Sequence, residues 1–186
     1  MSFVFKLKSY KILYILKKIV LLTVAVILIL ASVEVFGQGT SCETATPVCT
    51  GVATTYTPAT TGSAPVGNNY GTLGTSPVNP SWFVLTVGNA GNIVLTQTAS
   101  CNQNYVLWGP FTTFSQACSG LAATPFLSDA SAGNGNTISI TNAIAGRIYI
   151  LLLSNLGGCA GSVTISQTSG TGTLVRKNYS TCGVIA

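Results

Sequence analysis

Residues that could perform acid–base or nucleophilic chemistry are almost absent from this sequence. The 186 residues include no histidine, which removes the usual general base, the serine and cysteine triads and imidazole metal ligands. Beyond residue 37 the only side-chain carboxylates are Glu43, beside the first cysteine, and Asp129, in a polar turn. Glycosidases need two carboxylates that face each other. The positions of Glu43 and Asp129 in the sequence do not predict that their side chains lie close together. We therefore expect that the protein is not an enzyme.

A glycine-rich turn carries the best candidates for a metal site. Asp129, Asn134 and Asn136 place oxygen-bearing side chains within one short segment, and calcium prefers oxygen ligands. A single carboxylate gives little calcium affinity, and Asp and Asn are also favoured in turns for their backbone conformations. We prefer a plain hairpin turn, with calcium as the alternative, and expect no cofactor.

Aromatic side chains are the candidates for ligand binding. Tyr70, Trp82 and Phe114 lie in or beside a series of short apolar segments. Exposed rings on a flat sheet can stack on sugar rings, so we predict these three as ligand-binding positions. The alternative is that aromatic rings pack in the core, which we prefer for three others: Phe83, Trp108 and Tyr149.

Six cysteines predict a disulfide-bonded, exported protein: Cys42, Cys49, Cys101, Cys118, Cys159 and Cys182. The sequence has no CxxC motif, so a zinc site is not expected. Six cysteines allow fifteen pairings. Closeness in sequence favours Cys101 with Cys118, and closure of the chain ends favours Cys42 with Cys182. Cys49 with Cys159 would then remain.

The N-terminal segment has the pattern of an export signal. Five lysines precede an apolar run over residues 19–31, and small residues follow. Cleavage after Gly37 would leave residues 38–186 as one domain; an uncleaved membrane anchor over residues 1–37 is the alternative. Few charged residues remain beyond the signal, so nucleic-acid binding has no electrostatic support.

Short apolar segments separated by Gly, Asn and Pro predict an all-β domain. Residues 82–87 and 93–98 flank a Gly-Asn turn, and residues 105–108 follow, which predicts a meander of antiparallel strands. Within residues 82–87, Phe83, Leu85 and Val87 alternate with Trp82, Val84 and Thr86. Residues 147–154 are apolar on both faces, as in a central covered strand. About eight strands are expected, forming an antiparallel β-sandwich or jelly roll.

Two connecting segments have no clear periodicity. Residues 111–127 contain Cys118 and predict a long connection, because no segment beyond the signal has a helical pattern of apolar residues. A short strand at Phe126 and Leu127 is one interpretation of its end. Residues 57–79 are rich in Pro and Gly. A disordered linker is one interpretation, but Tyr70 and the nearby cysteines favour an ordered segment packed on the sandwich.

Four strings of the sequence resemble a known module. They are NYGTLGTSPVNPSWFVLTVGNAGNIVLTQ, NYVLWGPF, RIYILLLSNLGG and SVTISQTSGTGT. Together they resemble an N-terminal jelly-roll-like module of secreted and surface proteins of gliding Bacteroidetes, which are linked to gliding motility and type IX secretion. The resemblance implies a β-sandwich used in adhesion at the outer cell surface. Relatives typically have acidic residues where this chain has Asn102, Gln103 and Asn104.

These observations predict a non-catalytic extracellular interaction or adhesion module, secreted or displayed on the outer cell surface. A carbohydrate-binding accessory module is the alternative. The expected partner is an extracellular protein or a glycan, and no nucleic acid. We also expect that this protein can associate with copies of itself, because edge strands with so few charges can add to a neighbour's sheet.

Overall fold

The computed structural model describes residues 17–18, 39–130 and 133–176. The chain divides into two units, Met1–Phe36 and Gly37–Ala186. Lys17 and Lys18 are helical, and the rest of the expected signal peptide lies outside the described residues. In the described part, no helix has the length and apolar character needed to cross a membrane.

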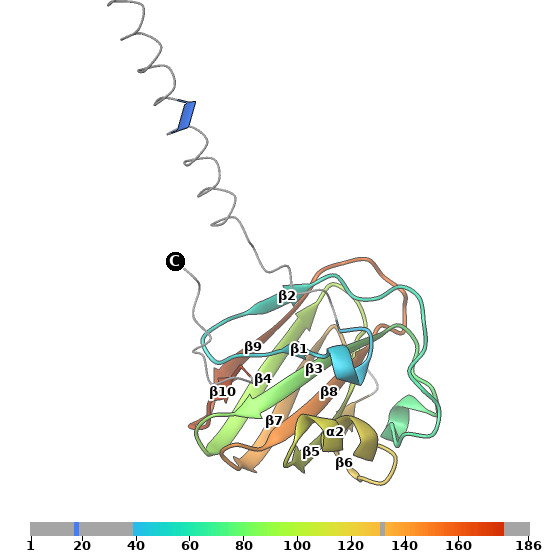
Figure 1. The fold of residues 1–186 in the computed structure, drawn as a ribbon. Coiled ribbons are helices and arrows are strands. Elements are labelled where there is room, and N and C mark those ends of the chain that lie inside the picture. Colours follow the sequence, from blue (N-terminus) through green and yellow to red (C-terminus); the bar gives the residue numbers. More distant parts are fainter. Residues whose placement is uncertain (1–16, 19–38, 131–132, 177–186) are drawn as a thin grey trace, which may run out of the picture. The chain divides into compact units, whose positions relative to one another are not determined.

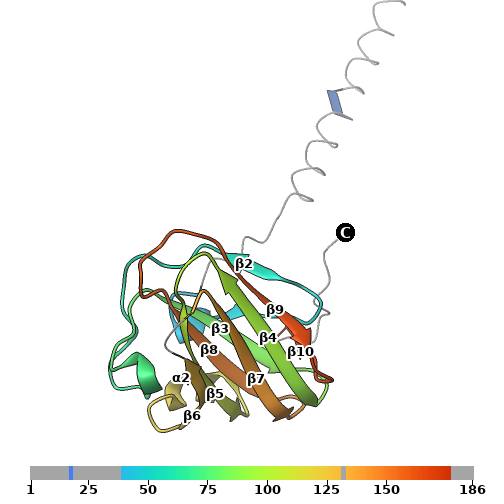
Figure 2. The ribbon, with the colours of Figure 1, turned by 180° about the vertical axis from the view of Figure 1, so that it is seen from behind.

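Two sheets form a β-sandwich, which confirms the predicted fold class (Figures 1 and 2). Sheet A has the order β1 (Thr46–Pro47), β3 (Pro80–Val87), β8 (Ile148–Ser154), β5 (Asn104–Phe111) and β6 (Phe126–Ala130), and β10 (Leu174–Val175) also pairs with β3. Sheet B has the order β2 (Thr54–Tyr56), β9 (Val163–Ser169), β4 (Gly91–Ala99) and β7 (Gly135–Ala143). The pairings are antiparallel except for the short one between β1 and β3.

The predicted meander is wrong, because the three strands expected to form it, β3, β4 and β5, do not pair with one another. β3 belongs to sheet A and β4 to sheet B, while β5 is separated from β3 by β8. The turn after β3 does not close a hairpin. Instead, Gly88 donates its N–H to the Thr173 carbonyl at 2.8 Å, and the Asn89 N–H donates to the Thr173 hydroxyl at 2.8 Å. The chain after β9 therefore holds this turn in its path from one sheet to the other.

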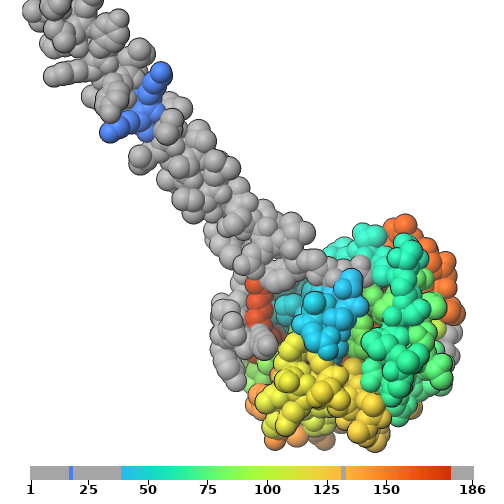
Figure 3. Space-filling model, turned by 45° about the vertical axis from the view of Figure 1, so that its right-hand side comes forward, coloured from blue at the N-terminus to red at the C-terminus, as the bar shows by residue number. Residues whose placement is uncertain are grey.

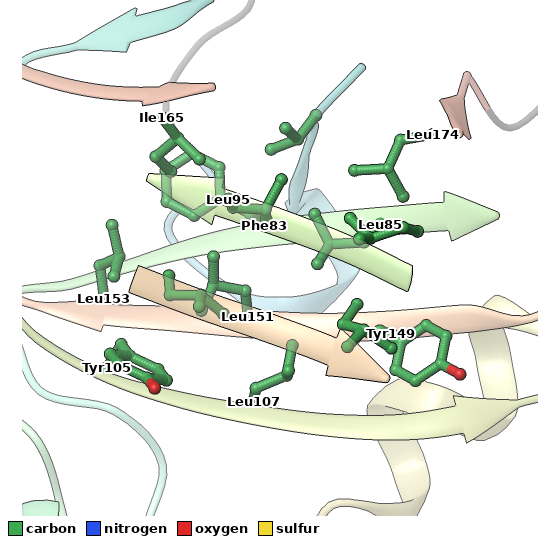
Figure 4. Packing of buried hydrophobic residues seen from close by; sticks show 14 of the residues in the cluster. Phe83, Leu85, Leu95, Tyr105, Leu107, Tyr149, Leu151, Leu153, Ile165 and Leu174 are labelled. Atoms are coloured by element: carbon green, nitrogen blue, oxygen red, sulfur yellow. The ribbon is translucent and has the colours of Figure 1, made fainter. Parts of the chain in front are cut away.

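The main core lies between the sheets, as Figure 4 shows. The predicted alternation of β3 is confirmed, since Phe83, Leu85 and Val87 are in this core while Trp82 and Val84 belong to a second cluster. β8 is buried along its whole length, which confirms the covered central strand predicted for this segment. Each large apolar side chain buried in this way contributes about 1.5–3 kcal/mol to folding.

A second apolar layer covers the outer face of sheet A. Its cover consists of residues 39–45, the segment 57–79 and the helix α2 (Phe114–Gly120), which lie side by side in Figure 3. Beneath the cover, the buried side chains include Trp82, Trp108 and Ile150. The segment 57–79 is therefore packed on the sandwich, as the sequence favoured. We call these three segments the cover of sheet A.

The helix α2 corrects the prediction of a loop without helix after residue 111, whereas β6 confirms the short strand at Phe126 and Leu127. Thr113 caps the helix, because its side chain accepts a hydrogen bond from the Gln116 N–H at 3.2 Å. Ala117 and Leu121, one turn apart, are both buried. The helix is too short for its apolar positions to form a recognisable period in the sequence.

The disulfide pairing differs from every predicted pair. Cys42 is bonded to Cys118, and Cys101 to Cys159; Cys49 is also disulfide-bonded. Cys42 and Cys118 join two parts of the cover, namely the 3-10 helix η1 (Cys42–Thr44) and α2. Closeness in sequence misled the prediction because Cys101 lies before β5 and Cys118 lies in α2, beyond the other end of that strand.

Candidate functional site

Two of the three aromatic candidates are buried rather than exposed. Trp82 stacks on Trp108 with an interplanar angle of 13° and ring centroids 6.1 Å apart. Such a coplanar pair would suit a sugar platform, but the two side chains are only 1% and 0% exposed. The expectation of an exposed ring at Trp82 is therefore wrong, because the apolar outer face of sheet A requires a cover.

Tyr70 is part of that cover and is 1% exposed. Its ring meets Trp108 edge-on, with centroids 5.7 Å apart. Its hydroxyl donates to the Pro65 carbonyl at 2.7 Å and accepts from the Asn68 side chain at 3.1 Å. Burial raises the pKa of the Tyr70 phenol, and the bond from Asn68 offsets part of that rise. Tyr70 therefore fixes segment 57–79 on the sheet, and its expected exposure is wrong.

Phe114, the third aromatic candidate, borders a pocket. The pocket has a volume of about 370 Å³ and is lined by Glu43, Phe114, Ser115, Cys118 and Ser119. It lies where η1 meets the first turns of α2, beside the Cys42–Cys118 disulfide. Figure 3 shows these two segments in contact. An aromatic ring, a carboxylate and two hydroxyls are groups that bind neutral polyols.

The three calcium candidates do not form a common site. The Asp129 carboxylate accepts hydrogen bonds from the N–H and the hydroxyl of Thr72, each at 2.6 Å. Asn136 is buried and donates to the Gln97 side chain and the Gln103 carbonyl, both at 2.7 Å. The described residues contain no group of three or more Cys, Asp or Glu that could hold a metal.

The expected hairpin at these residues is also corrected, since β6 belongs to sheet A and β7 to sheet B. Asp129 lies in β6 and Asn136 in β7. The Asn134 carbonyl accepts from the Ala99 N–H at 2.8 Å and so extends the pairing of β7 with β4. Each candidate therefore makes structural hydrogen bonds of its own, at a different place in the sandwich.

A buried amide network holds the end of the sandwich near the Cys101–Cys159 disulfide. The Gln103 side chain donates to Asn155 at 3.0 Å, and Asn155 donates to the carbonyls of Ala59 and Cys159 at 2.8 and 2.9 Å. Both side chains are 0% exposed. Sequence reasoning missed this network, although Asn102, Gln103 and Asn104 directly after Cys101 were a signal of it. Its role is to position loops.

The outer face of sheet B is the largest surface feature that sequence reasoning missed. Figure 2 shows its strands without a covering helix. The outward side chains are almost all hydroxyls: Thr55, Thr96, Thr98, Thr137, Ser139, Thr141, Thr164, Ser166 and Thr168. No strand of sheet B contains a charged residue. We call this surface the hydroxyl face.

The hydroxyl face is ordered by the register of the sheet. Thr98 lies opposite Thr164, which lies opposite Thr55. Thr96 lies between Ser166 and Thr137. Neighbouring strands are about 4.8 Å apart and alternate residues of one strand about 6.8 Å apart, so the hydroxyls form a grid. The hydroxyls of Thr55 and Thr164 are 2.9 Å apart.

Comparisons with known proteins do not show a family for this chain. No family model and no curated protein matches the sequence. One solved structure, titled "CBM4 structure and function", aligns with 62% of this chain and 93% of its own, at 11% identity and a TM-score of 0.31. A similarity of this size carries no argument about what this chain binds.

Proposed function

We propose that this protein is a non-catalytic extracellular adhesion module that binds an extended neutral polysaccharide with the hydroxyl face of sheet B. The observation that carries the proposal is the contrast between the two outer faces: the chain covers one and leaves the other open. The disulfides and the resemblance to surface modules of gliding Bacteroidetes support secretion or display on the outer cell surface.

The chemistry of the hydroxyl face favours a glycan over a protein partner. Protein interfaces draw most of their affinity from Trp, Tyr and Arg, and none of these types projects from the hydroxyl face. A surface without charge has no electrostatic attraction for phosphates or acidic polymers. Threonine and serine hydroxyls both donate and accept hydrogen bonds, as do the hydroxyls of a neutral sugar chain.

Binding of the full oxidised chain to insoluble neutral polysaccharides tests this proposal. Thr98→Lys places a charged side chain on an interior strand of the hydroxyl face and should abolish retention. Thr61→Lys is the matched control, because Thr61 is an exposed residue of the segment 57–79. Equal retention of both variants, or no retention of the unaltered protein by any polysaccharide, would refute the hydroxyl face as the binding surface.

The Phe114 pocket supports a second candidate function, an accessory module that binds short sugars. The combination of Phe114, Glu43 and two serines is the specific observation in its favour. In this case soluble oligosaccharides should bind, Phe114→Ala should abolish that binding, and Thr98→Lys should leave it intact. The two variants thus separate the two candidate functions.

A further inference from the structure

Strand β7 leaves one of its two edges without a partner strand in the described part of the chain. It is the last strand of sheet B and pairs only with β4. The Ala99 N–H donates to the Asn134 carbonyl, and hydrogen-bonded pairs alternate along an antiparallel ladder. The backbone groups of Asn136 and Ile138 therefore point toward β4. Those of Thr137 and Ser139 point away from it, to the free edge.

This edge lacks the features that usually protect a sheet from pairing. β7 is nine residues long and contains no charged residue and no proline. Its one irregularity lies near the C-terminal end, where Asn142 has a φ of 53°. By contrast β2, the other edge of sheet B, has three residues, and Pro58 follows soon after. Long uncharged edges are the ones that recruit another strand.

The sequence of β7 is a palindrome. Residues 136–142 read NTISITN, with Ser139 at the centre. A two-fold interface requires a surface that is complementary to itself, and a palindromic strand meets this requirement when two copies run antiparallel. Thr137 then lies opposite Thr141, and Ser139 opposite its own copy.

We propose that a second copy of this chain pairs with β7, antiparallel and centred on Ser139, so that two four-stranded sheets become one continuous sheet. Each hydrogen-bonded pair exchanges two N–H···O=C bonds, which uses the free groups of the edge. Thr–Thr pairs across the new ladder add to its stability. On the inner side, Ile138 of one copy lies opposite Ile140 of the other.

Pairing in this geometry joins the hydroxyl faces of two copies, because the outward side chains of β7 belong to that face. Two joined faces bind an extended polymer with higher avidity than one. The pairing itself does not depend on what the hydroxyl face binds. An interface built mainly on one strand is small, so the association is expected to be weak and to depend on concentration.

Sedimentation equilibrium of the full oxidised chain over a wide range of concentration tests the pairing. Ser139→Pro removes the N–H that points to the free edge while sparing the bonds to β4. Ser139→Lys places two positive charges opposite each other at the two-fold axis. Each variant should raise the dissociation constant of the dimer about tenfold or more. Ser139→Thr should leave it unchanged.

Thr98→Lys is the matched control for charge, because it adds the same charge to the same face on an interior strand. It should leave the dimer intact while it removes polysaccharide retention, so failure of the pairing and failure of the proposed function are distinguishable. A protein that is monomeric at every concentration would overturn the pairing. A dimer that both Ser139→Pro and Ser139→Lys leave unchanged would do so as well. Should Ser139→Pro fail to fold, Ser139→Lys still decides the question.

Discussion

The outer faces of the two sheets differ in composition, and this difference decides which one the chain covers. On sheet A, Trp82 and Val84 of β3 and Ile150 and Leu152 of β8 project outward, and all are buried. On sheet B the outward positions hold threonine and serine and remain open. Apolar area left in water costs about 25 cal/mol per Å², so only the first face has to be covered.

The comparison also separates structural from functional roles. The cover over sheet A and the layer beneath it contain both tryptophans, a helix and the Cys42–Cys118 disulfide, and these features explain stability. The hydroxyl face contributes little apolar burial, and under the proposed function its regular composition serves binding. Substitutions beneath the cover of sheet A should therefore lower the free energy of unfolding. Substitutions on the hydroxyl face should leave it nearly unchanged and, under the proposed function, weaken binding.

Removal of an aromatic ring from beneath the cover should cause the largest loss of stability. Trp108→Ala deletes a side chain that is 0% exposed and the hydrogen bond from its indole N–H to the Asn69 carbonyl at 2.9 Å. The free energy of unfolding should fall by about 3–5 kcal/mol, measured by urea denaturation. A loss below about 1 kcal/mol would mean that the cover does not stabilise the domain.

Removal of the Cys42–Cys118 disulfide should cause the second-largest loss of stability. The double variant Cys42→Ser, Cys118→Ser releases a link between residues 76 positions apart and should lower the free energy of unfolding by about 2–4 kcal/mol. Because the disulfide joins two parts of the cover, protease cleavage near residues 39–50 should also accelerate.

The variant Cys101→Ser, Cys159→Ser is the matched control, since it opens a link of 58 positions that joins neither η1 nor α2. It should cost a similar free energy of unfolding without accelerating cleavage near residues 39–50. Identical cleavage patterns in the two double variants would contradict a specific role of the first disulfide in holding the cover.

Gly71 should be sensitive to an added side chain, because it lies directly before Thr72, whose hydrogen bonds to Asp129 link the cover to β6. Its φ is +57°, and a Cβ there would lie 2.5 Å from the Asp129 Oδ2 atom. Gly71→Ala should lower the free energy of unfolding by about 2 kcal/mol, from backbone strain and displacement of the carboxylate. Gly67→Ala is the control, because its φ is +95° but nothing lies within 4 Å; it should cost about half as much.

Alkaline pH should lower the free energy of unfolding, because the domain buries several tyrosines. Burial raises the pKa of Tyr56, Tyr70 and Tyr149 above the ordinary value. An unfolded tyrosine loses its proton near pH 10 while the folded one retains it, so the unfolded state binds fewer protons and stability falls as pH rises above 10. The urea midpoint should show this fall, and Tyr70→Phe should make it shallower. An equal slope in both proteins would contradict the shift at Tyr70.

The strand alternation could be predicted from sequence because burial follows a period of two. The pattern of β3 correctly placed Phe83 and Trp82 on opposite faces, and the apolar run of β8 correctly indicated a covered central strand. The all-β class followed from the same patterns. These features depend on neighbouring residues only.

Strand pairing and the site could not be predicted because both depend on contacts distant in sequence. The turn after β3 looks like a hairpin, yet Thr173 holds it. Trp82 was expected on the surface because the sequence favoured packing of residues 57–79 on the sandwich without indicating which face they would cover. Tyr70 lies in that segment, and no sequence signal showed that its ring would point toward Trp108. The hydroxyl face was missed for a related reason: Thr96, Ser166 and Thr137 become one row only when β9, β4 and β7 are paired.

Removing a single hydroxyl from the open face should have the smallest effect on stability. Thr98→Ala deletes an exposed side chain, and the free energy of unfolding should change by less than about 0.5 kcal/mol. Under the proposed function, the same variant should still weaken retention on polysaccharide, because one position of the grid is lost. Trp108→Ala should show the reverse, with a large loss of stability and unchanged retention while the protein stays folded. If Thr98→Ala instead costs several kcal/mol, the hydroxyl face is part of the structural core of the domain, and the contrast between the two sheets fails.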